Sequence, residues 1–297
     1  MKIIKPIIFD ASMLLSSNAV EANPAWLIGT TYAKDDLVDY GTHIYISLVN
    51  SNVGNQPDTS PTQWLLVGPD NIHAMFDEQV NTVTTSSTPL EVSVEPGEIF
   101  NSLALINIQD ATSVTIEVTD GVSGPVVYDQ TIDLDDTVIV DWYLYFFEPF
   151  NFKTDVVITD IPPYSSGVIT MTLSAGAGTV GLGNFVFGNL YDLGLTQMGA
   201  NIGIRDYSVK QTDEFGNTTF VARAFSKRMD VSVYVKNTAI RLVSKVLGDI
   251  RATPCVYIAS EAEDYSPLIV YGFYRDYNID IAYPSHSIMR VEVEGLI

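Results

Sequence analysis

Hydrophobic and polar positions alternate along most of the chain between residues 72 and 204. Residues 90–94 and 114–118 alternate strictly, and shorter apolar runs follow at 155–159, 167–173 and 184–187. Successive side chains of a strand point to opposite faces, so this period of two predicts strands with one buried face. Short strands at this spacing, separated by turn residues, predict an antiparallel, jelly-roll-like β-sandwich over residues 72–204.

The C-terminal part mixes two periodicities. Residues 230–235 and 289–294 alternate as strands do, whereas residues 238–251 carry Ile240, Val243, Leu247 and Ile250 at three- and four-residue spacing. That spacing places the four side chains on one face of a helix, and Pro254 prevents its continuation. Residues 205–297 are therefore expected to form an α+β domain with one amphipathic helix.

Two further segments precede these domains. Residues 1–22 are expected to form an extended arm, and residues 23–71 a small aromatic β-module with short strands near 41–49 and 63–67. This module has no disulfide, and its size is near the lower limit for independent folding. We therefore expect it to be stabilised by contacts with a neighbouring part of the protein. The predicted fold class is mainly β throughout.

The net charge of −21 is unevenly distributed. Residues 1–204 hold four Lys and Arg against 24 Asp and Glu, while residues 205–297 hold 11 against 12. The acidic part repels phosphate backbones and anionic lipid, so neither nucleic acid nor membrane insertion is expected. No apolar run approaches the roughly 20 residues of a membrane helix. Pro6 and Asp10 interrupt the apolar N-terminal run, which argues against a signal peptide and favours synthesis in the cytoplasm.

The residues around the possible catalytic or cofactor-binding motifs do not fit those functions. The stretch 176–181, Gly-Ala-Gly-Thr-Val-Gly, matches the dinucleotide fingerprint, but a strand-like run follows where a helix is required, so a glycine-rich turn is the better interpretation. Cys255, the single cysteine, permits no intrachain disulfide and lies in an apolar run that favours a buried, inert thiol.

Metal ligation and hydrolytic chemistry are equally unsupported. The aspartates between 133 and 141 lack the glycine and glutamate of a calcium loop and are expected to form a solvated acidic edge. The three histidines lack metal-ligand spacing. We therefore expect no catalytic residue, no metal and no cofactor, and we do not expect an enzyme.

The aromatic residues of the small module are the candidate binding residues. They are Trp26, Tyr32, Tyr40, Tyr45 and Trp64. Aromatic rings stack on the apolar faces of sugars, but a tiny module also needs aromatic side chains as its core. From the residues alone the core interpretation is favoured for most of the five.

The order of these aromatic residues resembles the chitinase-type carbohydrate-binding modules. The likeness runs from Trp26 to Tyr45 and continues through Gly54, Pro57 and Trp64. Asp35 stands where that family prefers glycine. Residues 47–49, Ser-Leu-Val, replace the exposed aromatic pair that usually follows the last tyrosine.

The chain as a whole resembles a group of phage virion proteins that begin with such a module. The segments that carry the likeness are 71–77, 206–208, 212–219, 224–229, 251–254, 269–274, 280–284 and 294–297. The resemblance implies a structural component of a phage tail, assembled in the host cytoplasm into the virion, with other tail proteins as partners and as a homo-oligomer. Residues 205–297 are expected to dock on the tail. The alternative is a receptor-binding lectin that grips host surface polysaccharide through residues 23–71; a polysaccharide-degrading enzyme ranks below both.

Overall fold

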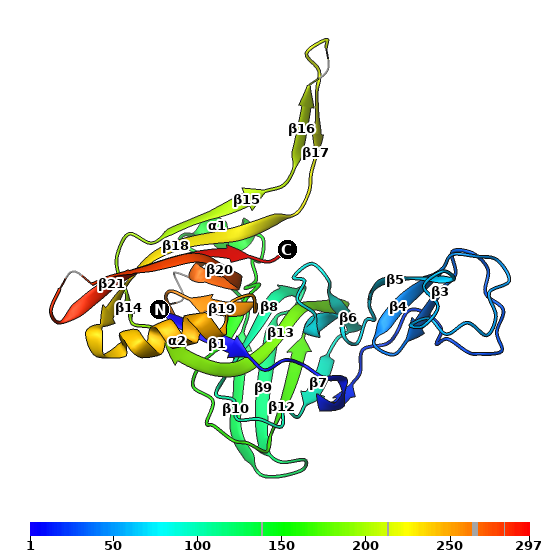
Figure 1. Ribbon diagram of the computed structural model, residues 1–297, viewed down its shortest axis with the longest axis horizontal. Coiled ribbons are helices and arrows are strands. Elements are labelled where there is room, and N and C mark those ends of the chain that lie inside the picture. The colour runs from blue at the N-terminus through cyan, green and yellow to red at the C-terminus, as the bar shows by residue number, and fades with distance from the viewer. Residues whose placement is uncertain (138, 213, 263–266, 282) are drawn as a thin grey trace.

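The fold is mainly β, as the alternation predicts. The computed structural model describes residues 1–137, 139–212, 214–262, 267–281 and 283–297. Strands hold 49% of the residues and helices 9%, and the paired strands are antiparallel. Figure 1 shows a central body from which the aromatic module and a long hairpin project in different directions.

The body is a β-sandwich. Its smaller sheet has the order β10 (Val126–Asp133), β9 (Ser113–Asp120), β12 (Gly167–Ser174), β7 (Leu90–Val94) and β2 (Leu14–Ser17). Alternate residues such as Val92, Ile116 and Met171 turn inward and are fully buried against Leu105 and Phe185 of the opposite sheet. Each fully buried apolar side chain stabilises the fold by about 1.5–3 kcal/mol. This pattern confirms the predicted sandwich.

The opposite sheet is much larger. In the described residues its main path is β11 (Val156–Ile158), β8 (Ser102–Gln109), β13 (Thr179–Asp192), β1 (Lys2–Pro6), β19 (Cys255–Ile258), β20 (Ile269–Asp280), β21 (His286–Gly295), β18 (Phe225–Lys236) and β14 (Leu195–Thr196). Two more strands join it, β6 (Thr84–Ser87) beside β13 and β15 (Asn201–Asp206) beside β18.

Strand β1 corrects two expectations about organisation. Residues 1–22, expected as an extended arm, are instead part of the body, because β1 pairs with β13 on one side and with β19 on the other, and Ile3 and Ile4 are fully buried. The segment also supplies β2 and the 3-10 helix η1 (Ala11–Met13). Since β1 joins strands from both 72–204 and 205–297, one sheet crosses the expected boundary, which itself falls inside β15.

The C-terminal helix packs as its spacing predicts. Helix α2 (Ile240–Asp249), preceded by η3 (Asn237–Ala239), buries Val243, Val246 and Leu247 against β18 and β21 residues such as Val233 and Met289. The Tyr274 hydroxyl donates to the Leu247 carbonyl at 2.9 Å and fixes the helix over β20. Strands covered by one amphipathic helix confirm the predicted α+β character.

Three elements stand outside this body. The module holds β3 (Leu37–Tyr40), β4 (His43–Ser47) and β5 (Trp64–Pro69), and η2 (Ala74–Phe76) follows it. Strands β16 (Val209–Thr212) and β17 (Thr218–Val221) continue β15 and β18 into the hairpin that rises from the body in Figure 1. The short helix α1 (Trp142–Phe147), absent from the sequence-based expectations, follows β10.

Candidate functional site

Two of the five candidate aromatic residues form the core of the module. Tyr32 and Trp64 are 7% and 2% exposed and meet edge to face, with ring centroids 5.3 Å apart. The Trp64 indole N–H donates to the Asn55 carbonyl at 2.9 Å, and the Tyr32 hydroxyl accepts from the Leu27 amide at 2.7 Å. Both polar tips are thus satisfied inside the module, so these two rings hold the module together.

The other three aromatic residues form a half-buried cluster beside this core. Trp26 and Tyr40 lie 5.5 Å apart at 87°, and Tyr40 and Tyr45 lie 6.5 Å apart at 68°. These near-perpendicular contacts are a favoured packing of aromatic rings. A flat sugar-stacking platform instead needs two rings in one plane, and neither of these two pairs provides it.

Both departures from the carbohydrate-module pattern have visible consequences. Asp35 adopts a left-handed backbone, φ 71°, which glycine adopts without strain and which explains the family's preference there. Its amide donates to the Ser47 carbonyl at 2.8 Å, so the turn closes despite the substitution. Leu48 and Val49 are exposed where the family carries aromatic rings, so this part of the surface is aliphatic.

The aliphatic character extends over much of the module. Its exposed apolar side chains include Leu27, Ile28, Leu37, Leu48, Val49, Val53, Leu65, Leu66 and Val67. Three of them are consecutive on β5, so both faces of this edge strand carry apolar groups. Exposed apolar side chains on consecutive residues of an edge strand are typical of a protein contact.

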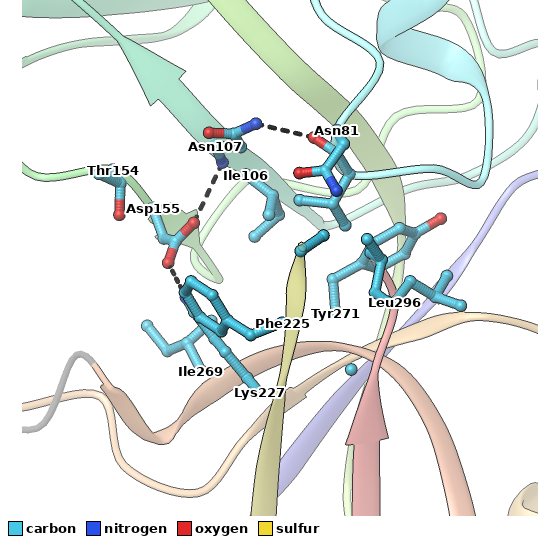
Figure 2. Close-up of a pocket in the computed structure, with 14 residues that line it drawn as sticks. Asn81, Ile106, Asn107, Thr154, Asp155, Phe225, Lys227, Ile269, Tyr271 and Leu296 are labelled. Atoms are coloured by element: carbon cyan, nitrogen blue, oxygen red, sulfur yellow. Dashed lines mark hydrogen bonds and ion pairs between the residues drawn. The ribbon is translucent and has the colours of Figure 1, made fainter. Parts of the chain in front are cut away.

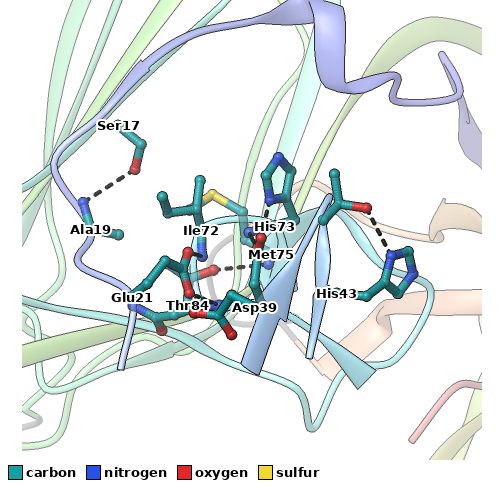
Figure 3. Close-up of polar contacts among 12 residues, drawn as sticks. Ser17, Ala19, Glu21, Asp39, His43, Ile72, His73, Met75 and Thr84 are labelled. Atoms are coloured by element: carbon teal, nitrogen blue, oxygen red, sulfur yellow. Dashed lines mark hydrogen bonds and ion pairs between the residues drawn. The ribbon is translucent and has the colours of Figure 1, made fainter. Parts of the chain in front are cut away.

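A polar network fixes the module to the body at its root. The Glu21 carboxylate accepts hydrogen bonds from the amides of Asn71 and Ile72, both at 2.9 Å. Figure 3 shows Glu21 beside Ile72. Asp70 accepts from the His73 amide at 2.8 Å and contacts the His73 ring at 2.6 Å. Burial raises the pKa of Glu21, an effect that these two amide hydrogen bonds oppose, and burial likewise raises the pKa of Asp39.

An apolar cavity of the body, about 320 Å³, lies where the large sheet meets the root of the hairpin. Ile106, Phe225 and Tyr271 contribute to its walls, and an ion pair between Lys227 and Asp155 lies at its side (Figure 2). The second Asp155 oxygen accepts from the Asn107 amide at 3.1 Å. Because Lys227 and Asp155 are paired with each other, neither is free to act as a general acid, general base or nucleophile in this cavity.

The remaining sequence motifs lie apart from these features. Residues 176–178 form a bend that enters β13, so no helix begins at the glycine-rich stretch. Cys255 is buried in β19, and burial raises the pKa of its thiol to about 12. No group of three or more His, Cys, Asp or Glu in the described residues could hold a metal ion. Over the same residues, no helix has the length and apolar character needed to cross a membrane.

Sequence reasoning missed one exposed aromatic segment, residues 139–152. Seven of the eleven residues from 142 to 152 are aromatic, and none of the six α1 residues is buried. The segment shows neither a strand period nor an amphipathic one, which is why periodicity did not reveal it. The density of aromatic residues between aspartates was the available signal.

Comparisons of the chain with protein-family models, with curated proteins and with solved structures give no match.

Proposed function

We propose that the chain is a structural component of a phage tail and that it acts by contacting other proteins of the assembly. The phage assignment rests on the residue patterns that resemble phage virion proteins. The assembly role rests on a separate observation, the hairpin formed by β16 and β17.

This hairpin has little support from its own chain. Seven of the eight residues in its two strands are exposed, and only Val209 is half-buried. An isolated two-stranded hairpin is marginally stable in water. Such an element gains stability when a neighbouring molecule covers it, so its projection from the body favours a role in assembly. It belongs to residues 205–297, the part proposed to dock on the tail.

The module supports the same role better than it supports sugar binding. Its two most buried aromatic rings form its core, its other three are near-perpendicular, and its exposed apolar groups are largely aliphatic. A receptor-binding lectin is the second candidate, favoured by the half-exposed cluster of Trp26, Tyr40 and Tyr45. The Trp26 indole N–H is buried and has no hydrogen-bond partner among the described residues, so it is a donor that a ligand could engage.

Complementation of a phage lacking this chain tests the proposal. We expect the full chain in the tail of cryo-electron maps, with residues 205–297 at the tail body. A chain in which a short Gly-Ser turn replaces residues 207–222 should fold but fail to enter particles. Val122→Ser, an exposed change in the turn between β9 and β10, is the matched control and should incorporate normally. Absence of the full chain from the tail, or normal incorporation without the hairpin, would refute the proposal.

A further inference from the structure

The exposed aromatic segment offers as much surface as a stable interface needs. Its six most exposed aromatic side chains are Trp142, Tyr143, Tyr145, Phe146, Phe147 and Phe150, at 61–78% exposure. A fully covered aromatic side chain buries about 150–250 Å², so the exposed fractions of the six together offer roughly 600–1,000 Å² per molecule. A standard protein interface buries about 800 Å² on each partner.

The segment is held in place at its base. The Asp136 amide donates to the Asn151 carbonyl at 2.8 Å, and the Asn151 amide donates to the Thr137 hydroxyl at 3.0 Å. Asp141 caps α1 by accepting from the Leu144 amide at 2.8 Å. The aromatic side chains are therefore presented on an ordered loop, which lowers the entropic cost of binding.

The charges around the segment argue against a membrane as its partner. Residues 133–152 contain five Asp and Glu and no Lys or Arg. An anionic lipid surface would repel these carboxylates. A partner should instead combine exposed apolar groups with a neutral or positive surface.

The chain carries such a surface itself, on the arm formed by residues 199–228. Ile202, Ile204 and Phe225 are 54–66% exposed at its lower part. The arm has five Lys and Arg against three Asp and Glu, in a chain whose net charge is −21. Arg205 and Arg228 pair with Glu294 and Glu292, and Lys227 pairs with Asp155. Each of these three basic side chains is nevertheless 41–56% exposed.

We propose that the aromatic segment 139–152 of one molecule packs against the arm 199–228 of a second copy. The inference rests on the proposed assembly function and names the partner and the two surfaces. The surfaces differ, so the contact is head-to-tail and repeats from copy to copy as a ring or filament. Within one molecule Phe152 and Lys227 line the same small cavity at the base of both surfaces, but the aromatic rings and the arm remain exposed.

Sedimentation velocity over a range of protein concentrations tests the contact on the full chain. We expect wild type to self-associate, and the double variant Phe146→Ser/Phe147→Ser to associate about a hundredfold more weakly, since central aromatic residues dominate interfaces. The double variant Ile202→Ser/Ile204→Ser should show a comparable loss. All four positions are exposed, so folding should be unaffected, and Val122→Ser should associate as wild type does.

Mixing the two double variants separates a head-to-tail contact from other kinds. Each variant keeps one intact surface, so an equimolar mixture should form heterodimers that neither variant forms alone and that do not grow further. Monomeric wild type at every concentration would overturn the proposal, as would unchanged association of either variant or a mixture without heterodimers. Binding of wild type to phosphatidylcholine vesicles that is lost in Phe146→Ser/Phe147→Ser would overturn it in favour of a lipid surface.

Measuring incorporation of the same variants into phage particles separates the test of this contact from the test of the tail role. If the chain lies in the tail but the variants self-associate normally, the contact is refuted and the tail role stands. If the variants lose self-association as expected but the full chain is absent from tails, the tail role is refuted and the contact stands.

Discussion

Leu247→Ala is the most direct test of how the C-terminal helix holds the large sheet. Leu247 lies on the buried face of α2, where it is fully buried among the side chains of β18 and β21. The substitution removes three carbon atoms, worth about 0.8 kcal/mol each by transfer from water, and the cavity that remains adds to this. A loss of about 2–5 kcal/mol is expected. The Tyr274 hydrogen bond is made to the backbone carbonyl of residue 247 and is retained.

The same helix supplies a matched control. Leu242 lies in α2 but is 55% exposed, so Leu242→Ala makes the same chemical change without opening a cavity. It should alter stability by no more than about 0.5 kcal/mol. Urea unfolding followed by far-UV circular dichroism measures both free energies. Equal losses in the two variants, or a loss below about 1 kcal/mol in Leu247→Ala, would refute the packing described for α2.

The continuous sheet also predicts how damage spreads. A buried carboxylate in Val243→Asp should disrupt α2 and expose the sheet beneath it. Because β1 hydrogen-bonds to β13 and β19 at once, the sandwich should lose protection together with the C-terminal part. Limited proteolysis of this variant decides the point. A protease-resistant fragment covering residues 72–204 would show instead that the expected boundary near 205 separates two cooperative units.

Two further predictions concern the module and its root. Chitin-type oligosaccharides should bind weakly or not at all, because the pairs Trp26–Tyr40 and Tyr40–Tyr45 are near-perpendicular; low-micromolar binding in a titration that disappears in Tyr40→Ala would contradict this. Burial raises the pKa of Glu21 and Asp39, so these carboxyls bind protons more readily in the folded state. The cost of burying these charged carboxylates is fully present when the pH is above their raised folded-state pKa. It disappears as the pH falls towards their pKa in the unfolded chain, about 4. As the pH is lowered through this window, the thermal midpoint of the wild type should therefore gain relative to that of Glu21→Gln; equal pH dependence in both proteins would contradict it.

Local periodicity predicted the elements whose burial is regular. The strict alternation at 90–94 gives β7 with the same bounds, since every second side chain enters the sandwich core. The apolar stripe at 240–250 gives α2 for the corresponding reason. In both cases the apolar positions in the sequence are the positions that face the core, so the local pattern is enough to predict the element.

Periodicity could not predict which distant strands pair with each other, nor could the net charge reveal an apolar segment within the acidic part of the chain. Ile3 and Ile4 are buried because two distant strands flank them, and no feature of residues 1–10 specifies those partners. The net charge of residues 1–204 likewise conceals the aromatic segment at 139–152. That charge predicts a surface that repels nucleic acid and anionic lipid, and it gives no sign of the aromatic side chains that α1 exposes.

The core and the surface of the module differ in character. Tyr32 and Trp64 are buried, and the turn at Asp35 closes through its amide, so the module has an aromatic core with a closed turn beside it. The exposed groups at 48–49 and 65–67 are aliphatic. Aliphatic side chains gain as much as others from burial against protein, but they lack the flat ring face that sugars stack on. These exposed groups are therefore better suited to a protein contact, the same use that we propose for the aromatic segment and the arm.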